Sequence, residues 1–284
     1  MSDAGLVVCL GDLVEDVVVS PAGPLRRGTD TPAVVQRRRG GSAANVAVNV
    51  VAAGGRARFV GAVGDDPAGR QLVAALRAEG VEVAVQRHGR TGSVVVVLDP
   101  DGERSFYTDR GACPTLARLP GGALRGAAAL HVPAYSLDGE PLAGLTRRTL
   151  ARARQLGLCR SIDASSVAVL ERLGVGALDE LDADVLFVNP DEAAWFGLHQ
   201  PRAGLVVYKG GKGPTVVLAA DGTRHEVAVE PPDRLADTTG AGDAFAAGFL
   251  VAHLAGASPR VAVAAGRRRA RHWLRDLGGA AGGP

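Results

Sequence analysis

The chain reads Asp237-Thr238-Thr239-Gly240-Ala241-Gly242-Asp243-Ala244-Phe245 and continues at once into the apolar run AAGFLVAHLAG. This pattern predicts a helix over 241–255. Backbone N–H groups at its start can approach a ligand closely because the side chains there are small, at Gly240, Ala241 and Gly242. Free first-turn amides and the helix dipole favour an anion such as a phosphate group. Asp243 would stand beside that anion, where it can take a proton from an attacking hydroxyl, although a helix-capping role fits these residues alone equally well.

Outward from this motif, short segments rich in Val and Leu alternate with amphipathic, Ala-rich segments. The alternation is typical of βαβ units and predicts a mostly parallel sheet with helices on both faces, a three-layer α/β fold. We expect core strands at 6–10, 57–60, 128–132, 159–162, 185–188 and 205–208. We expect helices at 43–53, 68–79, 144–155, 191–196, 241–255 and 259–274.

Two stretches, 16–39 and 93–109, break this rhythm. Each has the pattern of a hairpin, the second around a turn at 99–102, and the βαβ scheme leaves no helix to cover either of them. We therefore predict a small β lid over the open end of the main sheet. The chain has no internal repeat and no strong domain boundary, so one domain over residues 1–284 is expected.

Composition excludes several classes of protein. With 284 residues, 46% of them hydrophobic, the chain can bury a large core. A net charge of +2 gives no reason to expect a nucleic-acid partner, and the arginine clusters at 37–39 and 267–271 are expected on solvated faces. The three cysteines lack the spacing of a metal site or a disulfide framework. Without a basic leader or an uncharged apolar run of about 18 residues, we expect a cytoplasmic protein with no membrane partner.

A second informative segment reads Gly40-Gly41-Ser42-Ala43-Ala44-Asn45-Val46-Ala47 and is followed by Gly54 and Gly64. Together with DTTGAGDAFAAGFL, it resembles the two signatures of the ribokinase-like (PfkB) carbohydrate kinases, in the right order and over nearly the whole chain. The chain has neither a P-loop nor a GxGxxG motif after a strand. The resemblance implies a ribokinase-like α/β/α fold and an ATP-dependent transfer of phosphate to a sugar hydroxyl, with Asp243 as general base.

The resemblance also implies a set of substrate-binding residues. Asp16 follows Gly11, the glycine that ends the first strand, by five positions and would bind sugar hydroxyls, since a carboxylate can accept two of them at once. The second substrate element comprises Gly40, Gly41, Ser42 and Asn45. From the residues alone, a surface acid at Asp16 and a helix cap at Asn45 remain open.

On the nucleotide side, Asn189 and Glu192 resemble an NxxE element that supports Mg²⁺ and the phosphates, with Glu192 acting through water, although a plain helix start remains open. The loop 208–213 resembles the strand-end loop along ATP, which implies nucleotide contacts from Lys209, Gly210 and Gly213. Asp237 and Thr239 match positions that hold a monovalent cation in potassium-activated relatives. The cofactors implied are ATP and Mg²⁺, with K⁺ as an open possibility.

Some positions depart from the family pattern. Ribokinases usually carry Asn where this chain has Val14 and Lys where it has Ser42, which places ribose in doubt. A nucleoside kinase with an adenosine-like substrate is one alternative, in which Phe106, Tyr107 or Tyr135 would stack on the base, although a place in the lid core is the favoured reading for these side chains. A catalytically idle sugar-binding relative is another. Relatives often pair through their lids, and an exposed lid predicts a homodimer here.

Overall fold

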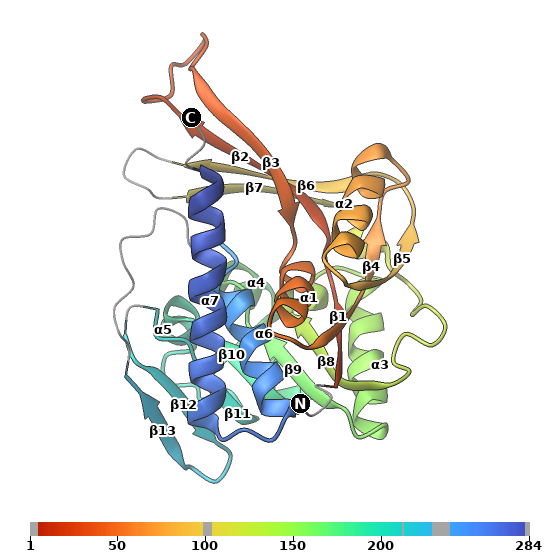
Figure 1. The fold of residues 1–284 in the computed structure, drawn as a ribbon, viewed down its shortest axis with the longest axis vertical. Helices are drawn as coiled ribbons and strands as arrows, with labels where there is room; N and C mark the ends of the chain where they lie inside the picture. Colours follow the sequence, from red (N-terminus) through yellow and green to blue (C-terminus); the bar gives the residue numbers. More distant parts are fainter. Residues whose placement is uncertain (1–4, 99–103, 212, 229–238, 282–284) are drawn as a thin grey trace.

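The computed structural model describes residues 5–98, 104–211, 213–228 and 239–281. Its main sheet comprises β1 (Leu6–Leu10), β4 (Arg56–Val63), β5 (Glu82–Arg87), β8 (Ala127–Pro133), β9 (Cys159–Asp163), β10 (Ala183–Val188), β11 (Ala203–Tyr208), β12 (Thr215–Ala219) and β13 (Arg224–Val227). The strand order is β13-β12-β11-β10-β9-β8-β1-β4-β5 (Figure 1). Pairing is parallel from β11 to β5, whereas β12 pairs antiparallel with both β11 and β13. The carboxyl ends of the parallel strands therefore meet at one edge.

Helices cover both faces of this sheet (Figure 1). One face carries α1 (Ser42–Ala52), α2 (Pro67–Ala78), α6 (Ala241–Leu254) and α7 (Pro259–Ala281), and the other carries α3 (Leu142–Gln155), α4 (Val167–Leu173) and α5 (Pro190–Phe196). Short 3₁₀ turns lie at Cys113–Thr115, Ala134–Leu137 and Asp179–Leu181. The predicted three-layer ribokinase-like fold class is confirmed.

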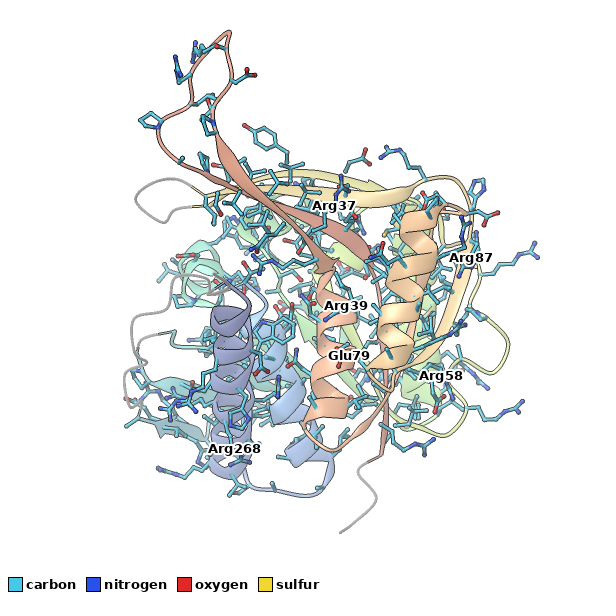
Figure 2. The ribbon with its side chains drawn as sticks, turned by 45° about the horizontal axis from the view of Figure 1, so that its top comes forward. Arg37, Arg39, Arg58, Glu79, Arg87 and Arg268 are labelled. Carbon is cyan, nitrogen blue, oxygen red and sulfur yellow. The ribbon has the colours of Figure 1, made fainter. Side chains whose placement is uncertain are left out.

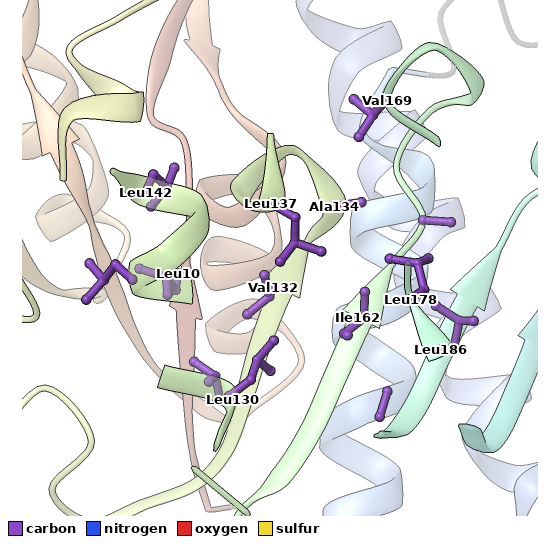
Figure 3. Packing of buried hydrophobic residues seen from close by; sticks show 14 of the residues in the cluster. Leu10, Leu130, Val132, Ala134, Leu137, Leu142, Ile162, Val169, Leu178 and Leu186 are labelled. Carbon is purple, nitrogen blue, oxygen red and sulfur yellow. The ribbon is translucent and has the colours of Figure 1, made fainter. Parts of the chain in front are cut away.

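Strand periodicity explains why each strand contributes to two cores. On β1, Val7 and Cys9 pack with α1, whereas Val8 and Leu10 pack on the α3 side, because successive side chains point to opposite faces. Figure 3 shows the core on the α3 side, where Leu130, Val132 and other aliphatic side chains of neighbouring strands meet the helices. Such strands are buried on both faces and so read as continuous apolar runs in the sequence.

The lid is a separate four-stranded sheet with the order β3-β2-β6-β7. Its strands are β2 (Val14–Pro21), β3 (Ala33–Gly40), β6 (Thr91–Leu98) and β7 (Arg104–Gly111). Two antiparallel pairs join through the parallel pairing of β2 with β6. Because β2 begins just after β1, the lid stands at the carboxyl ends of the parallel strands. The turn predicted at 99–102 lies outside the described residues, and the division into one domain with a lid at 16–39 and 93–109 stays a proposal.

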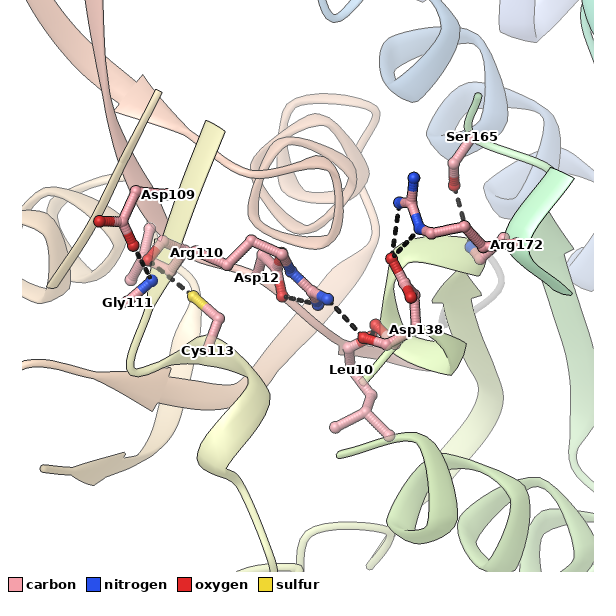
Figure 4. Close-up of polar contacts among 12 residues, drawn as sticks. Leu10, Asp12, Asp109, Arg110, Gly111, Cys113, Asp138, Ser165 and Arg172 are labelled. Carbon is pink, nitrogen blue, oxygen red and sulfur yellow. Dashed lines mark hydrogen bonds and ion pairs between the residues drawn. The ribbon is translucent and has the colours of Figure 1, made fainter. Parts of the chain in front are cut away.

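A chain of charged groups fastens the lid to the main sheet (Figure 4). Arg110, near the end of β7, donates from Nε and Nη2 to the Asp12 carboxylate at 2.7 and 2.9 Å, and from Nη1 to the Asp138 carbonyl. The Asp138 carboxylate in turn pairs with Arg172 at 2.6 Å. Arg110 and Asp12 are largely shielded from water, so removing either partner would leave an uncompensated charge. This linkage ties the lid strand β7 to the segments that follow β1 and β8.

Among the residues that the structure describes, no helix is both long and apolar enough to pass through a membrane.

Phe187 of β10 anchors the helix that carries Asp243. Its ring meets Phe245 and Phe249 of α6 nearly at right angles, with centroids 6.2 and 5.4 Å apart. We predict that Phe187→Ala lowers the free energy of unfolding by about 3–5 kcal/mol, because a large cavity opens beneath α6. The measurement is urea unfolding followed by circular dichroism.

The matched control is Phe106→Ala, on a lid strand where the side chain is 55% exposed. It should change the same free energy by less than about 0.5 kcal/mol. Equal losses in the two variants would contradict the anchoring role of Phe187.

Candidate active site

The two signature segments meet at Asp243. This residue lies in the first turn of α6, directly after the helix start at Gly240. One carboxylate oxygen accepts a hydrogen bond from Ser42 Oγ at 2.7 Å, and the other accepts one from Asn45 Nδ2 at 3.0 Å. Both donors come from the first turns of α1, about 200 residues earlier in the chain. The fold thus brings together three of the residues singled out in the sequence.

The di-glycine before α1 makes this approach possible. A Cβ on Gly40 would overlap the carboxylate of Asp16, and one on Gly41 would overlap the backbone carbonyl of Asp12. Gly41 also has φ +98°, in the left-handed region that other residues avoid. A side chain at Gly41 would push α1 away from the backbone that follows β1, and a side chain at Gly40 would displace the Asp16 carboxylate. The two glycines therefore allow Asp16 to lie close to the start of α1.

Lys209 brings a buried positive charge to the same place. It follows β11, and its Nζ lies 2.6 Å from the Asp163 carboxylate at the end of β9. A Cβ on Gly242 would lie 3.2 Å from this ammonium group, so the charge stands beside the start of α6. Burial lowers the pKa of Lys209, but Asp163 and Glu192 outweigh it and leave the pKa above its ordinary value. Sequence reasoning did not assign Asp163 a role, because no local motif marks it as the partner of Lys209.

Asn189 and Glu192 form a reciprocal helix cap at the start of α5. The Glu192 carboxylate accepts hydrogen bonds from the Asn189 backbone N–H at 2.7 Å and from its Nδ2 at 2.6 Å, and the Glu192 N–H donates to Asn189 Oδ1. Glu192 is fully buried. Burial, and next the charge of Asp163, raise its pKa to about 7. Its side chain is therefore held rigidly by Asn189.

The nucleotide-loop glycines lie in a tight turn after β11. The Gly213 N–H donates to the Gly210 carbonyl at 2.7 Å, and a Cβ on Gly210 would overlap the Pro214 carbonyl. Lys212 lies outside the described residues. The roles of Lys209, Gly210 and Gly213 toward a nucleotide stay predictions.

Arg39 is a site residue that the sequence analysis missed. It lies where the lid strand β3 joins α1 (Figure 2), and its Nη1 donates to Asn45 Oδ1 at 2.6 Å. This contact fixes the amide of Asn45 so that the NH₂ group faces Asp243. The expectation that the arginine cluster at 37–39 is merely solvated is wrong for Arg39. The signal that could have revealed it is its position directly before the Gly40-Gly41 motif.

The second arginine cluster also makes internal contacts. Arg269 Nε donates to Asn49 Oδ1 at 2.6 Å, and Asn49 Nδ2 donates to the Asn45 carbonyl at 2.8 Å. Arg267 donates to Thr215 Oγ1 at 2.7 Å and to the Gly213 carbonyl at 3.3 Å. The expectation of a purely solvated face at 267–271 is therefore wrong for these two arginines.

Comparison with known proteins places this geometry in a family. The model of the pfkB family carbohydrate kinases matches residues 4–281. The chain belongs to the pfkB family. A fructokinase from Klebsiella pneumoniae is 33% identical over 266 residues, which cover 87% of this chain and 83% of that protein. Fructokinase-1 from Oryza sativa is 30% identical over 269 residues, covering 86% and 82% of the two chains. This pfkB chain is therefore an ATP-dependent sugar kinase by family.

Solved structures confirm the fold of this pfkB kinase. The adenosine kinase from Sinorhizobium meliloti superposes with a TM-score of 0.84 at 23% identity, covering 96% of this chain and 94% of that one. A putative ribokinase II from E. coli in complex with ATP and Mg²⁺ superposes with a TM-score of 0.81 at 19% identity, covering 95% and 92%. At these identities the likeness concerns the fold alone.

The residues of the kinase fit a magnesium ion held mainly by phosphate oxygens and water. Within the described ranges, no group of three or more His, Cys, Asp or Glu side chains is arranged as a metal cage. Three carboxylates, from Asp163, Glu192 and Asp243, are nevertheless close enough to Lys209 for each of them to raise its pKa. Mg²⁺ usually keeps several waters and binds through few carboxylates, which suits this arrangement.

The monovalent-cation site at Asp237 and Thr239 stays a prediction. Asp237 lies outside the described residues. The carbonyl of Thr239 accepts a hydrogen bond from Trp273 Nε1 at 2.8 Å, which uses one of its two lone pairs. A cation at this carbonyl would have to use the other.

Asp243 must be ionised to accept a proton. Burial raises its pKa to about 6, with a further contribution from Asp163, while the hydrogen bonds from Ser42 and Asn45 oppose this rise. We predict that kcat falls about tenfold per pH unit below pH 6, because the base is then protonated. The measurement is a pH–rate profile of ADP release at saturating substrates.

Ser42→Ala tests whether the inflection of this pH–rate profile belongs to Asp243. Glu192 also has a pKa near this range, but Ser42 hydrogen-bonds Asp243 and not Glu192. Losing a donor to the ionised form should move the inflection to higher pH. An inflection that stays fixed or moves down would assign it to another group.

Proposed function

We propose that this kinase transfers the γ-phosphate of ATP to a hydroxyl of a free, uncharged sugar, with fructose or a similar ketose as the substrate class and Asp243 as the general base. The observation that carries the proposal is the convergence of Ser42 and Asn45 on the Asp243 carboxylate at the start of α6. The fructokinase relatives support the choice of sugar.

The proposed chemistry follows from what each group can do. Asp243 accepts the proton of the attacking hydroxyl, and the amides from Gly240 to Gly242 stabilise charge on the transferring phosphoryl group. The Lys209 ammonium, beside Gly242, adds positive charge at the same point. Bound Mg²⁺ would neutralise charge on the phosphate oxygens. Closure of the lid over the sugar would exclude water and so suppress hydrolysis of ATP.

The sugar side of the site supports an uncharged substrate. Asp16, which lies against Gly40, can accept two sugar hydroxyls, and Asn45 offers an amide beside the base. Arg110, a lid arginine that could bind a substrate carboxylate, already makes a two-pronged contact with Asp12. The substrate-binding roles of Asp16, Gly40, Gly41, Ser42 and Asn45 rest on this geometry and are proposals.

An adenosine-like substrate is the second candidate. The expectation that Phe106 and Tyr107 belong to the lid core is wrong, since they are 55% and 68% exposed on β7. Exposed aromatic rings on a lid can stack on a nucleobase. The two candidates separate in one assay, in which a sugar kinase releases ADP with hexoses and a nucleoside kinase releases it with adenosine.

Asp243→Asn is the decisive variant. We predict that it lowers kcat by about 10² to 10⁴-fold, because the base that takes the hydroxyl proton is lost. The measurement is ADP release with Mg²⁺-ATP and a panel of fructose, other hexoses, pentoses, deoxy-keto acids and adenosine. The same panel, repeated in K⁺ and in choline, tests the monovalent cation.

Asp65→Asn is the matched control, since its side chain is 72% exposed, and it should leave turnover unchanged. Asp243→Asn should still show a sugar-induced rise in melting temperature. Native turnover in Asp243→Asn would exclude Asp243 as the base, and no ADP release by the unmodified protein with any substrate would favour an idle sugar-binding protein.

For the assembly we propose a cytoplasmic homodimer in which two lids pack together. The strand β3 forms one edge of the lid, and it exposes Val34 and Val35, which are 61% and 57% accessible. We predict that Val35→Lys converts a dimer to a monomer in light scattering at micromolar concentration, because a second copy could no longer cover this edge. A monomeric mass for the unmodified protein would contradict the proposal.

A further inference from the structure

Trp273 of α7 lies against the turn from which α6 begins. Its Nε1 donates to the Thr239 carbonyl at 2.8 Å. A Cβ on Gly240 would lie 2.9 Å from the same nitrogen, so the edge of the indole rests on the Gly240 Cα. Gly240 has φ +73°, in the left-handed region, and any side chain there would displace the ring. The contact with Trp273 therefore depends on two features, the hydrogen bond to the Thr239 carbonyl and the glycine at position 240.

This hydrogen bond fixes the direction of a backbone amide. The peptide between Thr239 and Gly240 is trans, so its C=O and N–H groups point in opposite directions. The indole holds the carbonyl toward α7 and thereby turns the Gly240 N–H away from α7. On the other side, the Gly240 carbonyl accepts from the Ala244 N–H at 2.9 Å and closes the first turn of α6. The turn directly before Asp243 is thus held at both of its peptides.

Close packing of α6 on α7 keeps the Trp273 indole beside the turn at Gly240. A Cβ on Gly248 would lie 2.7 Å from the Ala265 carbonyl, and one on Gly266 would lie 2.8 Å from the Phe245 carbonyl. Glycine at both positions lets the two backbones touch, so α7 has little freedom to slide along α6. One turn before Trp273, Arg269 bonds Asn49 of α1 and fixes the helix against a third element.

We propose that Trp273 is a positioning residue for phosphoryl transfer: its indole N–H orients the Thr239–Gly240 peptide so that the amides at the start of α6 face the transferring phosphate. This inference rests on the proposed function, since the amides matter only if phosphate passes there. The indole nitrogen is a donor with a single hydrogen, and that hydrogen is committed to Thr239, so Trp273 acts through the backbone and not on the phosphate itself.

The test compares Trp273→Phe with Trp195→Phe, which changes the other of the two tryptophans, on α5. Trp273→Phe keeps an aromatic ring but removes the donor. We expect kcat to fall by about 10 to 100-fold, since misplacing groups by an ångström at a reacting centre has effects of this size. The sugar KM should stay within about threefold, because binding of the sugar does not use these amides. Trp195→Phe should keep the turnover of the unmodified kinase.

A second measurement does not depend on turnover. Trp195→Phe leaves Trp273 as the single tryptophan, so its fluorescence reports on the turn before α6. Addition of Mg²⁺-ATP should change the emission, and adding the sugar alone should not. Replacing Trp273 in this background by its benzothienyl analogue, which has sulfur in place of N–H and nearly the same shape, should reproduce the loss of kcat without a folding defect.

The outcomes are distinguishable. If the unmodified protein and Trp195→Phe release ADP and Trp273→Phe does so at the same kcat, the positioning role is overturned and the kinase function stands. If none of the three proteins releases ADP, the proposed function fails. If the fluorescence emission of Trp273 does not change on addition of Mg²⁺-ATP, the positioning role is overturned. A rise in KM with unchanged kcat in Trp273→Phe would also overturn it.

Discussion

The carboxylate of Asp243 is the group on which the rest of the site depends. A charge surrounded by protein is unfavourable unless it is hydrogen-bonded, and burial raises the pKa of this carboxyl to about 6. Ser42 and Asn45 offset that effect by donating to its two oxygens. The proposed base is therefore ionised at neutral pH, yet its pKa lies near enough to that range for it to give the proton up again. The position of α1 against α6 consequently matters for the proposed chemistry as well as for the packing.

The other charges around Asp243 have to be balanced in the same way. Lys209 is charged although its side chain is only 13% exposed, because Asp163 lies 2.6 Å away. Burial favours the neutral amine, whereas the charges of Asp163 and Glu192 raise the pKa and favour the positive charge at the start of α6. Glu192 shows the opposite case, since burial and Asp163 raise the pKa of its carboxyl to about 7. Three strand ends, of β9, β10 and β11, thus contribute to one electrostatic balance.

The sequence predicts an element correctly where the residues of a single segment determine its structure. The apolar runs of β1 and β10 and the small residues at the start of α6 predict buried strands and an anion-binding helix without reference to anything else. The edge strand β5 is half-exposed and has no buried apolar run, and the helix α4 buries only Val169 and Leu170; the sequence analysis missed both elements. Asp163 and Arg39 could not be assigned either, because each is defined by a partner distant in the chain or in another element.

The helix α7 shows why such long-range contacts matter. Arg267 contacts the nucleotide loop at Gly213, Arg269 contacts α1 at Asn49, and Trp273 contacts the turn before α6. These three side chains reach three parts of the site that lie far apart in the sequence, and one rigid helix sets their spacing. Arg267 contacts backbone carbonyls and a hydroxyl, and Arg269 contacts the Asn49 amide and Asp276 of its own helix. The sequence therefore shows no charge pattern that would point from these arginines to another element. Through these contacts α7 can fix the relative positions of the proposed base, the proposed anion site and the loop after β11.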